Sequence, residues 1–143
     1  MILIDANLLI YAVNSDSSHH PAARRWLEQV LSESTEVGLA WIVILAFIRI
    51  TTRPGILQSP LEPDVACGFI ADWLEQPFVN TIAPGPNHWP LLRNLLTATG
   101  TAGNLTSDAH LAALALEHRG AIYSADYDFQ RFPGLTHVNP LVG

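Results

Sequence analysis

Short apolar runs alternate with longer amphipathic segments along the chain of 143 residues. The short runs have the length of strands, and the first of them, the β-branched run at residues 2–4, reads as a strand that is buried on both faces of a sheet. They predict strands at residues 2–4, 37–40, 79–82, 121–124 and 136–138. In the longer segments apolar residues recur at every third or fourth position, which is typical of amphipathic helices. Helices are predicted from Pro21, from Pro63, through Trp89 and over residues 107–119.

One apolar run, residues 41–52, does not reveal its structure through its periodicity, because buried helices and buried strands both read as continuous apolar stretches. Its many β-branched residues favour a strand, at least in part. Pro54 and Gly55 end the run in either case. Strands that alternate with helices predict an α/β fold with a central parallel sheet covered on both faces. The length suits a single domain over residues 1–143.

The composition favours a well-packed cytoplasmic protein without a membrane anchor. Hydrophobic residues make up 49% of the chain and charged residues only 14%, which argues against disorder. The N-terminus lacks a basic region, so no signal peptide is predicted. The longest apolar run, residues 39–48, is too short to span a bilayer. The single cysteine, Cys67, excludes an internal disulfide and suits a reducing compartment.

The formal net charge of −6 argues against nucleic-acid binding through a simple basic surface. It remains compatible with nucleic-acid chemistry if acidic residues gather around metal ions that neutralise them. All seven basic residues are arginines. The absence of lysine excludes a Walker A phosphate loop and Schiff-base chemistry.

Four acidic residues stand out because of where they fall. Asp5 ends the first strand, Asp108 lies in the first turn of an apolar helix, and Asp126 and Asp128 follow the strand at 121–124. Ends of parallel strands and the starts of the following helices share one edge of a sheet, so these carboxylates are predicted to converge. A divalent cation relieves their repulsion, and hard oxygen ligands favour Mg²⁺ or Mn²⁺ over zinc. Such a site activates water and stabilises charge on a phosphodiester.

Each of these acids also has an ordinary structural interpretation. Asp108 is placed to complement a helix dipole, and Asp126 and Asp128 are typical turn residues. Asp5 is harder to explain in this way. An acid that closes a buried strand costs stability unless something pairs with it.

Other polar and aromatic residues receive structural roles. Asn7 and Thr106 are predicted as helix N-caps. The six histidines lack metal-ligand spacing and are predicted on the surface. Trp26, Trp73 and Trp89 fall on the apolar stripes of helices and are predicted in the core.

Four segments carry a resemblance to a known family. They are residues 2–9, residues 47–52, residues 103–113 and residues 124–129. In this order and at this spacing they resemble the PIN-domain family, in particular the VapC toxins of bacterial toxin–antitoxin modules. The resemblance covers essentially the whole chain. It implies a three-layer α/β/α fold, and a helix through Phe47 and Arg49.

The same resemblance implies an enzyme, namely a Mg²⁺- or Mn²⁺-dependent endoribonuclease that cleaves RNA as the toxin of its module. It also implies a homodimer and inhibition by a cognate VapB-type antitoxin whose arm blocks the acidic pocket. The positions that match the family's catalytic, metal-binding acids are Asp5, Asp108 and Asp126, with Asp128 as an auxiliary metal position.

Three further residues are expected around these acids. Asn7 and Ser124 match polar positions of the family and are expected to orient ligands from behind the metal-binding acids. Arg49 is expected to fix the acids, to touch RNA, or to form a buried structural ion pair.

One position departs from the family. A glutamate usually precedes the Phe-x-Arg piece, and this chain has Ala46 there. Either Asp128 takes over its role, or the enzyme is weaker or needs more metal, or the alanine is an inactivating substitution. The alternative function is therefore a catalytically weakened PIN module that acts mainly by binding antitoxin or RNA. An aspartyl-phosphate phosphatase with Asp5 as its nucleophile is disfavoured by Asn7 and by the absence of lysine.

Overall fold

A central sheet of five parallel strands organises the fold. The computed structural model describes residues 1–142. The strands are β1 (Ile2–Ile4), β2 (Val37–Ala40), β3 (Val79–Ile82), β4 (Ala121–Tyr123) and β5 (His137–Val138). They lie in the order β3-β2-β1-β4-β5, and every neighbouring pair is parallel. All five predicted strands are confirmed, the last two each one residue shorter than predicted.

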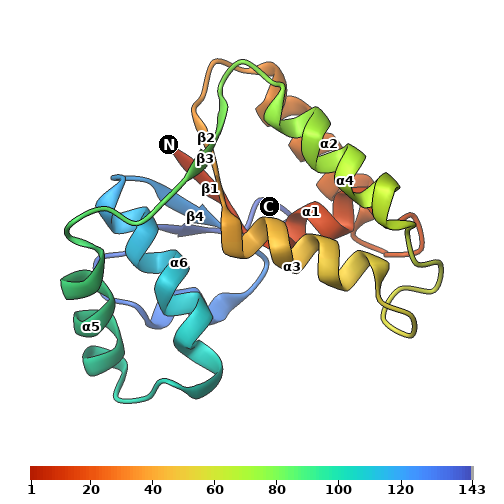
Figure 1. Ribbon diagram of the computed structural model, residues 1–143. Helices are drawn as coiled ribbons and strands as arrows, with labels where there is room; N and C mark the ends of the chain where they lie inside the picture. The colour runs from red at the N-terminus through yellow and green to blue at the C-terminus, as the bar shows by residue number, and fades with distance from the viewer. Residues whose placement is uncertain (143) are drawn as a thin grey trace.

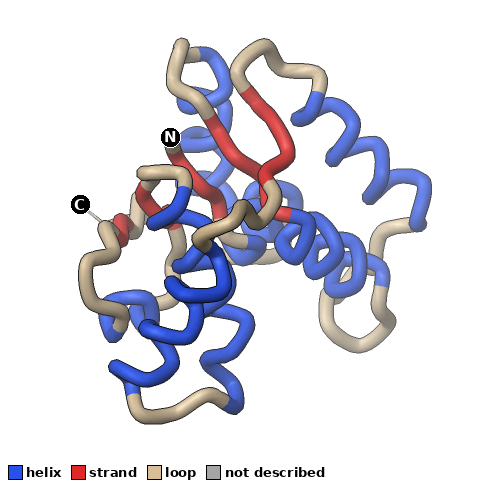
Figure 2. Tube along the Cα trace, turned by 60° about the vertical axis from the view of Figure 1, so that its left-hand side comes forward, coloured by secondary structure: helices blue, strands red, loops and turns tan. Residues whose placement is uncertain are grey.

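Helices lie on both sides of this sheet, as Figures 1 and 2 show. They are α1 (Ala6–Val13), α2 (His20–Ser32), α3 (Trp41–Thr52), α4 (Pro63–Leu74), α5 (His88–Thr99) and α6 (Thr106–Glu117). Helices α5 and α6 pack together on one side, whereas α1 packs with α2 and α3, and α3 with α4, on the other. The three-layer α/β/α fold is confirmed. Within residues 1–142, no helix is long and apolar enough to cross a membrane.

The run over residues 41–52 is a helix, so the strand favoured by propensity is wrong and the structure implied by the family resemblance is confirmed. Val43, Ile44, Phe47 and Thr51 are buried along one side of α3. This spacing follows the helical period and buries one face against the rest of the fold, which outweighs the weak preference of β-branched residues for strands. The Thr51 hydroxyl donates to the Phe47 carbonyl at 2.7 Å, so this buried polar group is satisfied within the helix.

The two predicted N-caps are both wrong, and the first error is informative. Asp5, not Asn7, caps α1: its Oδ1 atom accepts a hydrogen bond of 2.8 Å from the backbone N–H of Ala6. Asn7 lies inside the helix and its side chain is free to bond elsewhere. Thr106 is the first residue of α6, because a short 3₁₀ helix, η1 (Gly103–Leu105), runs directly into it.

A close backbone approach positions β4 beside β1. Gly120 connects the end of α6 to β4, and a Cβ atom placed there would lie 2.9 Å from the Met1 carbonyl oxygen and 2.8 Å from Leu3 Cδ1. Only glycine fits this position without a shift of the neighbouring strand. The pairing it permits aligns Ile4 with Tyr123, so both strands end at the same level.

The three tryptophans predicted in the core differ in their burial. Trp73 is buried, and the half-buried Trp26 stacks on Tyr123 with ring centroids 5.7 Å apart. Trp89 is 65% exposed, so its predicted place in the core is wrong. Helix α5 buries the face that carries His88, and Trp89, as the next residue, is rotated by about 100° away from that face.

Candidate metal centre at the carboxyl edge of the sheet

Asp5, Asp126 and Asp128 lie beyond the carboxyl ends of the neighbouring strands β1 and β4, and Asp108 lies in the first turn of α6. Asp5 follows β1 directly, and its backbone N–H donates to the Tyr123 carbonyl at 2.9 Å. Ser124 follows β4, and the next few residues lead into the 3₁₀ helix η2 (Tyr127–Arg131). Because β1 and β4 are paired neighbours, Asp5 and Ser124 are brought side by side although 119 positions separate them.

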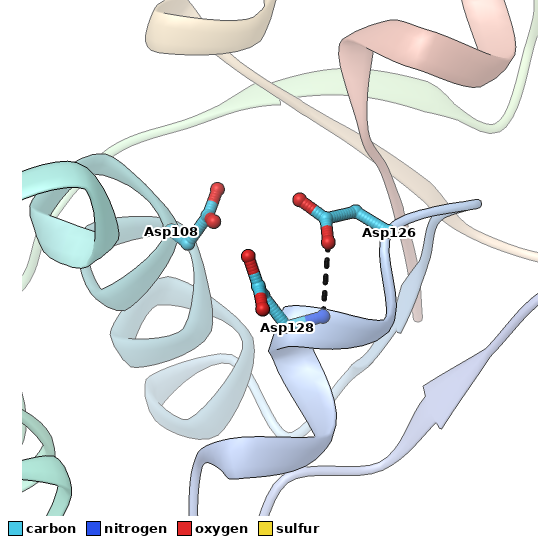
Figure 3. Close-up of side chains that lie close together, drawn as sticks. All are labelled: Asp108, Asp126 and Asp128. Atoms are coloured by element: carbon cyan, nitrogen blue, oxygen red, sulfur yellow. Dashed lines mark hydrogen bonds between the residues drawn. The ribbon is translucent and has the colours of Figure 1, made fainter.

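Asp108, Asp126 and Asp128 form a carboxylate cluster. Each offers one oxygen atom, and these three atoms all lie within 4.8 Å of one another. Figure 3 shows the side chain of Asp108 reaching from its helix toward Asp126 and Asp128 on the segment opposite. Asp126 also caps η2, since its Oδ1 atom accepts a hydrogen bond of 2.9 Å from the Asp128 N–H. Its structural role as a turn residue and its place in the cluster are therefore compatible.

Asp5 lies beside Ser124 and is more deeply buried than Asp108. Its Oδ2 atom accepts a hydrogen bond of 2.7 Å from the Ser124 hydroxyl, while Oδ1 caps α1. Burial raises the pKa of Asp5, although its hydrogen bonds to Ser124 and Ala6 oppose this effect. Nearby Asp126 adds a smaller repulsion in the same direction as burial. The partners that Asp5 requires are thus a hydroxyl and a backbone amide.

The Ser124 hydroxyl is saturated by its three hydrogen bonds. It accepts from Asn7 Nδ2 at 3.1 Å and from the Asp126 N–H at 3.0 Å, and both of these groups are donors only. Its own hydrogen is therefore directed to Asp5. Ser124 is fully buried. Asn7 also accepts a bond from the Ala125 N–H at 3.3 Å, so it fastens the start of α1 to the segment after β4.

The electrostatics of the cluster fit a cation. Burial, together with weaker repulsion by Asp126, Asp5 and Asp128, raises the pKa of Asp108 to about 6. Several carboxylates that share a poorly solvated site repel one another, and a divalent cation removes that repulsion. The donors are all hard carboxylate oxygens, without a histidine or cysteine, which suits Mg²⁺ or Mn²⁺.

Comparison with known proteins identifies the family. The PIN-domain family model matches residues 2–135. The chain belongs to the PIN-domain family. It is 46% identical over 140 residues to Ribonuclease VapC37 of Mycobacterium tuberculosis, and the aligned region covers 98% of this chain and 97% of that relative. It is 38% identical to Ribonuclease VapC33 of the same organism, over 99% of both chains.

Solved structures agree with this PIN-domain fold. The crystal structure of Mycobacterium tuberculosis VapC20, described as a toxin that cleaves the sarcin–ricin loop, superposes with a TM-score of 0.71 at 18% identity and covers 98% of this chain and 100% of that one. VapBC2 from Rickettsia felis, solved with a DNA fragment from its promoter, also gives 0.71, at 16% identity, with 97% of this chain and 98% of that one covered. The resemblance to VapC toxins inferred from the sequence is confirmed.

A cavity opens beside the cluster of this PIN domain, and Asp5 and Asp108 are the acidic residues that line it. It has a volume of about 380 Å³, and its lining includes Asp5, Asn7, Asp108, Ala46 and Arg49. Ala46 therefore lies on the cavity wall, where the usual glutamate of the family is missing.

Arg49 is exposed at this cavity. Within residues 1–142, the one ion pair closer than 4.0 Å joins Arg24 to Glu28 on α2. Arg49 therefore forms no ion pair there, and the buried ion pair considered for it is wrong. Its guanidinium is left to face the solvent and any ligand that enters the cavity.

The histidines are not all surface residues. His88 is buried and its Nε2 atom lies 2.9 Å from Nδ1 of the half-buried His110. His137 is half-buried, and its Nε2 atom lies 2.9 Å from the Ser124 carbonyl oxygen. His137 is thus a neighbour of the site that was not predicted from the sequence. The available signal was its place in the strand that follows the acid-bearing segment.

Proposed function

We propose that the chain is a Mg²⁺- or Mn²⁺-dependent endoribonuclease that acts as the toxin of a VapBC-type toxin–antitoxin module. The observation that carries the proposal is the cluster of three carboxylate oxygens within 4.8 Å of one another, at the carboxyl edge of a PIN-domain sheet. The curated relatives named as VapC ribonucleases, which match over nearly the full length of both chains, support the reaction class.

The metal would be held by Asp108, Asp126 and Asp128, with Asp5 beside them. Both oxygens of Asp5 already accept hydrogen bonds, but each carboxylate oxygen has a second lone pair available for a cation. When bound, the cation lowers the pKa of a coordinated water and stabilises charge on the scissile phosphate. The site is acidic before it is loaded, so metal binding is also required for a polyanionic substrate to approach.

Asn7 and Ser124 would orient the metal-binding acids, and Arg49 would bind the RNA. Asn7 and Ser124 hold the acidic segment after β4 against the start of α1 through a chain of hydrogen bonds. Arg49 is the arginine on the cavity wall and would bind a phosphate of the RNA backbone. A guanidinium suits this role because it donates several hydrogen bonds to phosphate oxygens.

The same proposal extends to the partners of the chain, its oligomeric state and its location. We expect an RNA substrate, a VapB-type antitoxin as inhibitor and a homodimer of single-domain chains, acting in the cytoplasm. Ala46 supports a second candidate, a weakened PIN module that works mainly by binding antitoxin or RNA, since the cavity wall lacks a carboxylate at that position. Metal binding measured by calorimetry separates the two, because only the nuclease requires a loaded site.

The direct test is RNA cleavage by the purified protein with Mn²⁺ or Mg²⁺. Asp126→Asn should lower the rate by about 100-fold or more, because metal-ion catalysis supplies several kcal/mol and each 1.36 kcal/mol is tenfold. Asp72→Asn is the matched control, since Asp72 is an exposed aspartate on α4. Cleavage that survives both EDTA and Asp126→Asn would contradict the proposal. Failure to bind Mn²⁺ at millimolar concentration, with intact folding, would favour the non-catalytic module.

A further inference from the structure

His137 joins the acidic segment to the edge of the sheet. It lies in β5, the neighbour of β4, and its Nε2 atom lies 2.9 Å from the Ser124 carbonyl oxygen. A carbonyl oxygen only accepts hydrogen bonds, so Nε2 must carry the proton. In the neutral imidazole, this assignment leaves Nδ1 without a hydrogen, as an acceptor. Nδ1 is buried and has no hydrogen-bond partner within residues 1–142.

That unpaired nitrogen argues for a specific use of histidine at this position. A buried acceptor without a partner costs stability, and a phenylalanine ring would fill the same space without this cost. What phenylalanine would lack is the Nε2–H donor. The histidine is thus explained by its bond to Ser124 and not by packing alone.

The ring also contacts the two aromatic residues that flank Asp128. Tyr127 lies nearly perpendicular to it with centroids 5.8 Å apart, and Phe129 lies 5.9 Å away. Both belong to η2, which Asp126 caps. His137 therefore touches the acidic segment on both sides of Asp126: at the Ser124 carbonyl before it and at η2 after it.

The position of Ser124 matters for three of the polar residues described above. Its backbone is fixed by His137 on the carbonyl and by a 3.0 Å bond from its N–H to the Val138 carbonyl oxygen. Its side chain is fixed by bonds to Asp5, Asn7 and the Asp126 N–H. A shift of the Ser124 peptide would therefore displace the hydroxyl that holds Asp5 and the amide that leads into Asp126.

We propose that His137 is a positioning residue for the carboxylate cluster. Its Nε2–H group fixes the Ser124 peptide and its ring fixes η2, so that Asp126 and Asp128 stay opposite Asp108. The inference rests on the proposed function in one respect, namely that the cluster binds a divalent cation. Outer residues that orient metal ligands typically change metal affinity by about 10–100-fold when they are replaced.

The test compares His137→Phe with His137→Gln by Mn²⁺ calorimetry and RNA cleavage. His137→Phe keeps an aromatic ring and removes the donor, and should weaken Mn²⁺ binding by about tenfold or more. It should also lower kcat and leave KM for RNA unchanged. His137→Gln keeps an N–H donor and should recover most of the Mn²⁺ affinity. His19→Phe, at an exposed histidine beside Tyr11, is the matched control and should bind Mn²⁺ as the wild type does.

The outcomes separate the two proposals. If the folded wild type binds no Mn²⁺, the proposed function and this inference both fail. If the wild type binds Mn²⁺ and folded His137→Phe binds it equally well, only the role of His137 is overturned. Because His137→Phe is at risk of misfolding, ¹⁵N NMR of the wild-type histidines gives an independent check. The Nε2–H tautomer of His137 supports the proposal, and the Nδ1–H tautomer overturns it.

Discussion

Removing the Asp108 carboxylate should stabilise the metal-free protein while it abolishes metal binding. The pKa of Asp108 is about 6 in the folded chain, against an ordinary value of 3.8. The folded state therefore holds a proton on this carboxyl at pH values where the unfolded state has released it. Stability is lost as the pH rises from about 4 to about 6, and the full cost persists above that window. Asp108→Asn removes the ionisable group and with it the cost.

The size of the effect follows from the shift. About two pKa units correspond to about 3 kcal/mol. Asp108 is only half-buried, so solvent screening reduces this to about 1–2 kcal/mol. For a chain of this length such a gain should raise the melting temperature by about 3–8 °C.

The assay is thermal unfolding of wild type and Asp108→Asn in EDTA at pH 7.5 and at pH 4. The variant should melt higher at pH 7.5, and the gain should nearly vanish at pH 4. Saturating Mn²⁺ should reverse the order, because it stabilises only the protein that binds it. A variant that is less stable than wild type at pH 7.5 in EDTA, or one whose gain is the same at both pH values, would refute the reasoning.

Three further predictions concern the surroundings of the cluster. Ala46→Glu should tighten Mn²⁺ binding several-fold and lower the metal-free melting temperature, because it adds a carboxylate to the cavity that Asp5 and Asp108 line. Calorimetry measures the first effect and thermal melting in EDTA the second, and the control Ala46→Gln should show neither. Ser124→Ala should lower the free energy of unfolding by about 1–3 kcal/mol in urea titrations, since Asp5 loses its hydroxyl partner; an unchanged value would contradict this. Arg49→Ala should raise KM for RNA about fivefold without changing Mn²⁺ affinity, as expected for the loss of about 1 kcal/mol from one phosphate contact. Weaker Mn²⁺ binding by this variant would show instead that Arg49 supports the metal-binding acids.

The sequence predicted the sheet well because parallel strands buried on both faces leave a simple signature. The runs at residues 2–4 and 37–40 are short and apolar, and both are buried strands. At residues 41–52 propensity alone predicts the wrong structure, because β-branched residues pack as well in a buried helix as in a strand. Only the surrounding structure decides which of the two forms.

The convergence of the acids was predictable from topology alone. Strand ends and helix starts share one edge of a parallel sheet, which predicts Asp108 and Asp126 at that edge, and the carboxylate cluster has that arrangement. Their assignment as metal ligands stays a prediction.

Contacts beyond the strand ends were not predictable from the sequence. The bonds of Asp5 to the Ser124 hydroxyl, and of Ser124 to His137, join residues that are far apart in the sequence. They depend on the pairing of β1 with β4 and of β4 with β5. A periodicity carries no information about such pairs.

The most direct test of the account is a crystal structure of the Mn²⁺-soaked protein with anomalous diffraction at the manganese edge. A strong peak is expected in direct contact with carboxylate oxygens of Asp108, Asp126 and Asp128. The same crystals of Asp108→Asn should lose that peak. A Mn²⁺ ion bound elsewhere, or a wild-type carboxylate cluster that stays free of metal at millimolar Mn²⁺, would contradict the central claim.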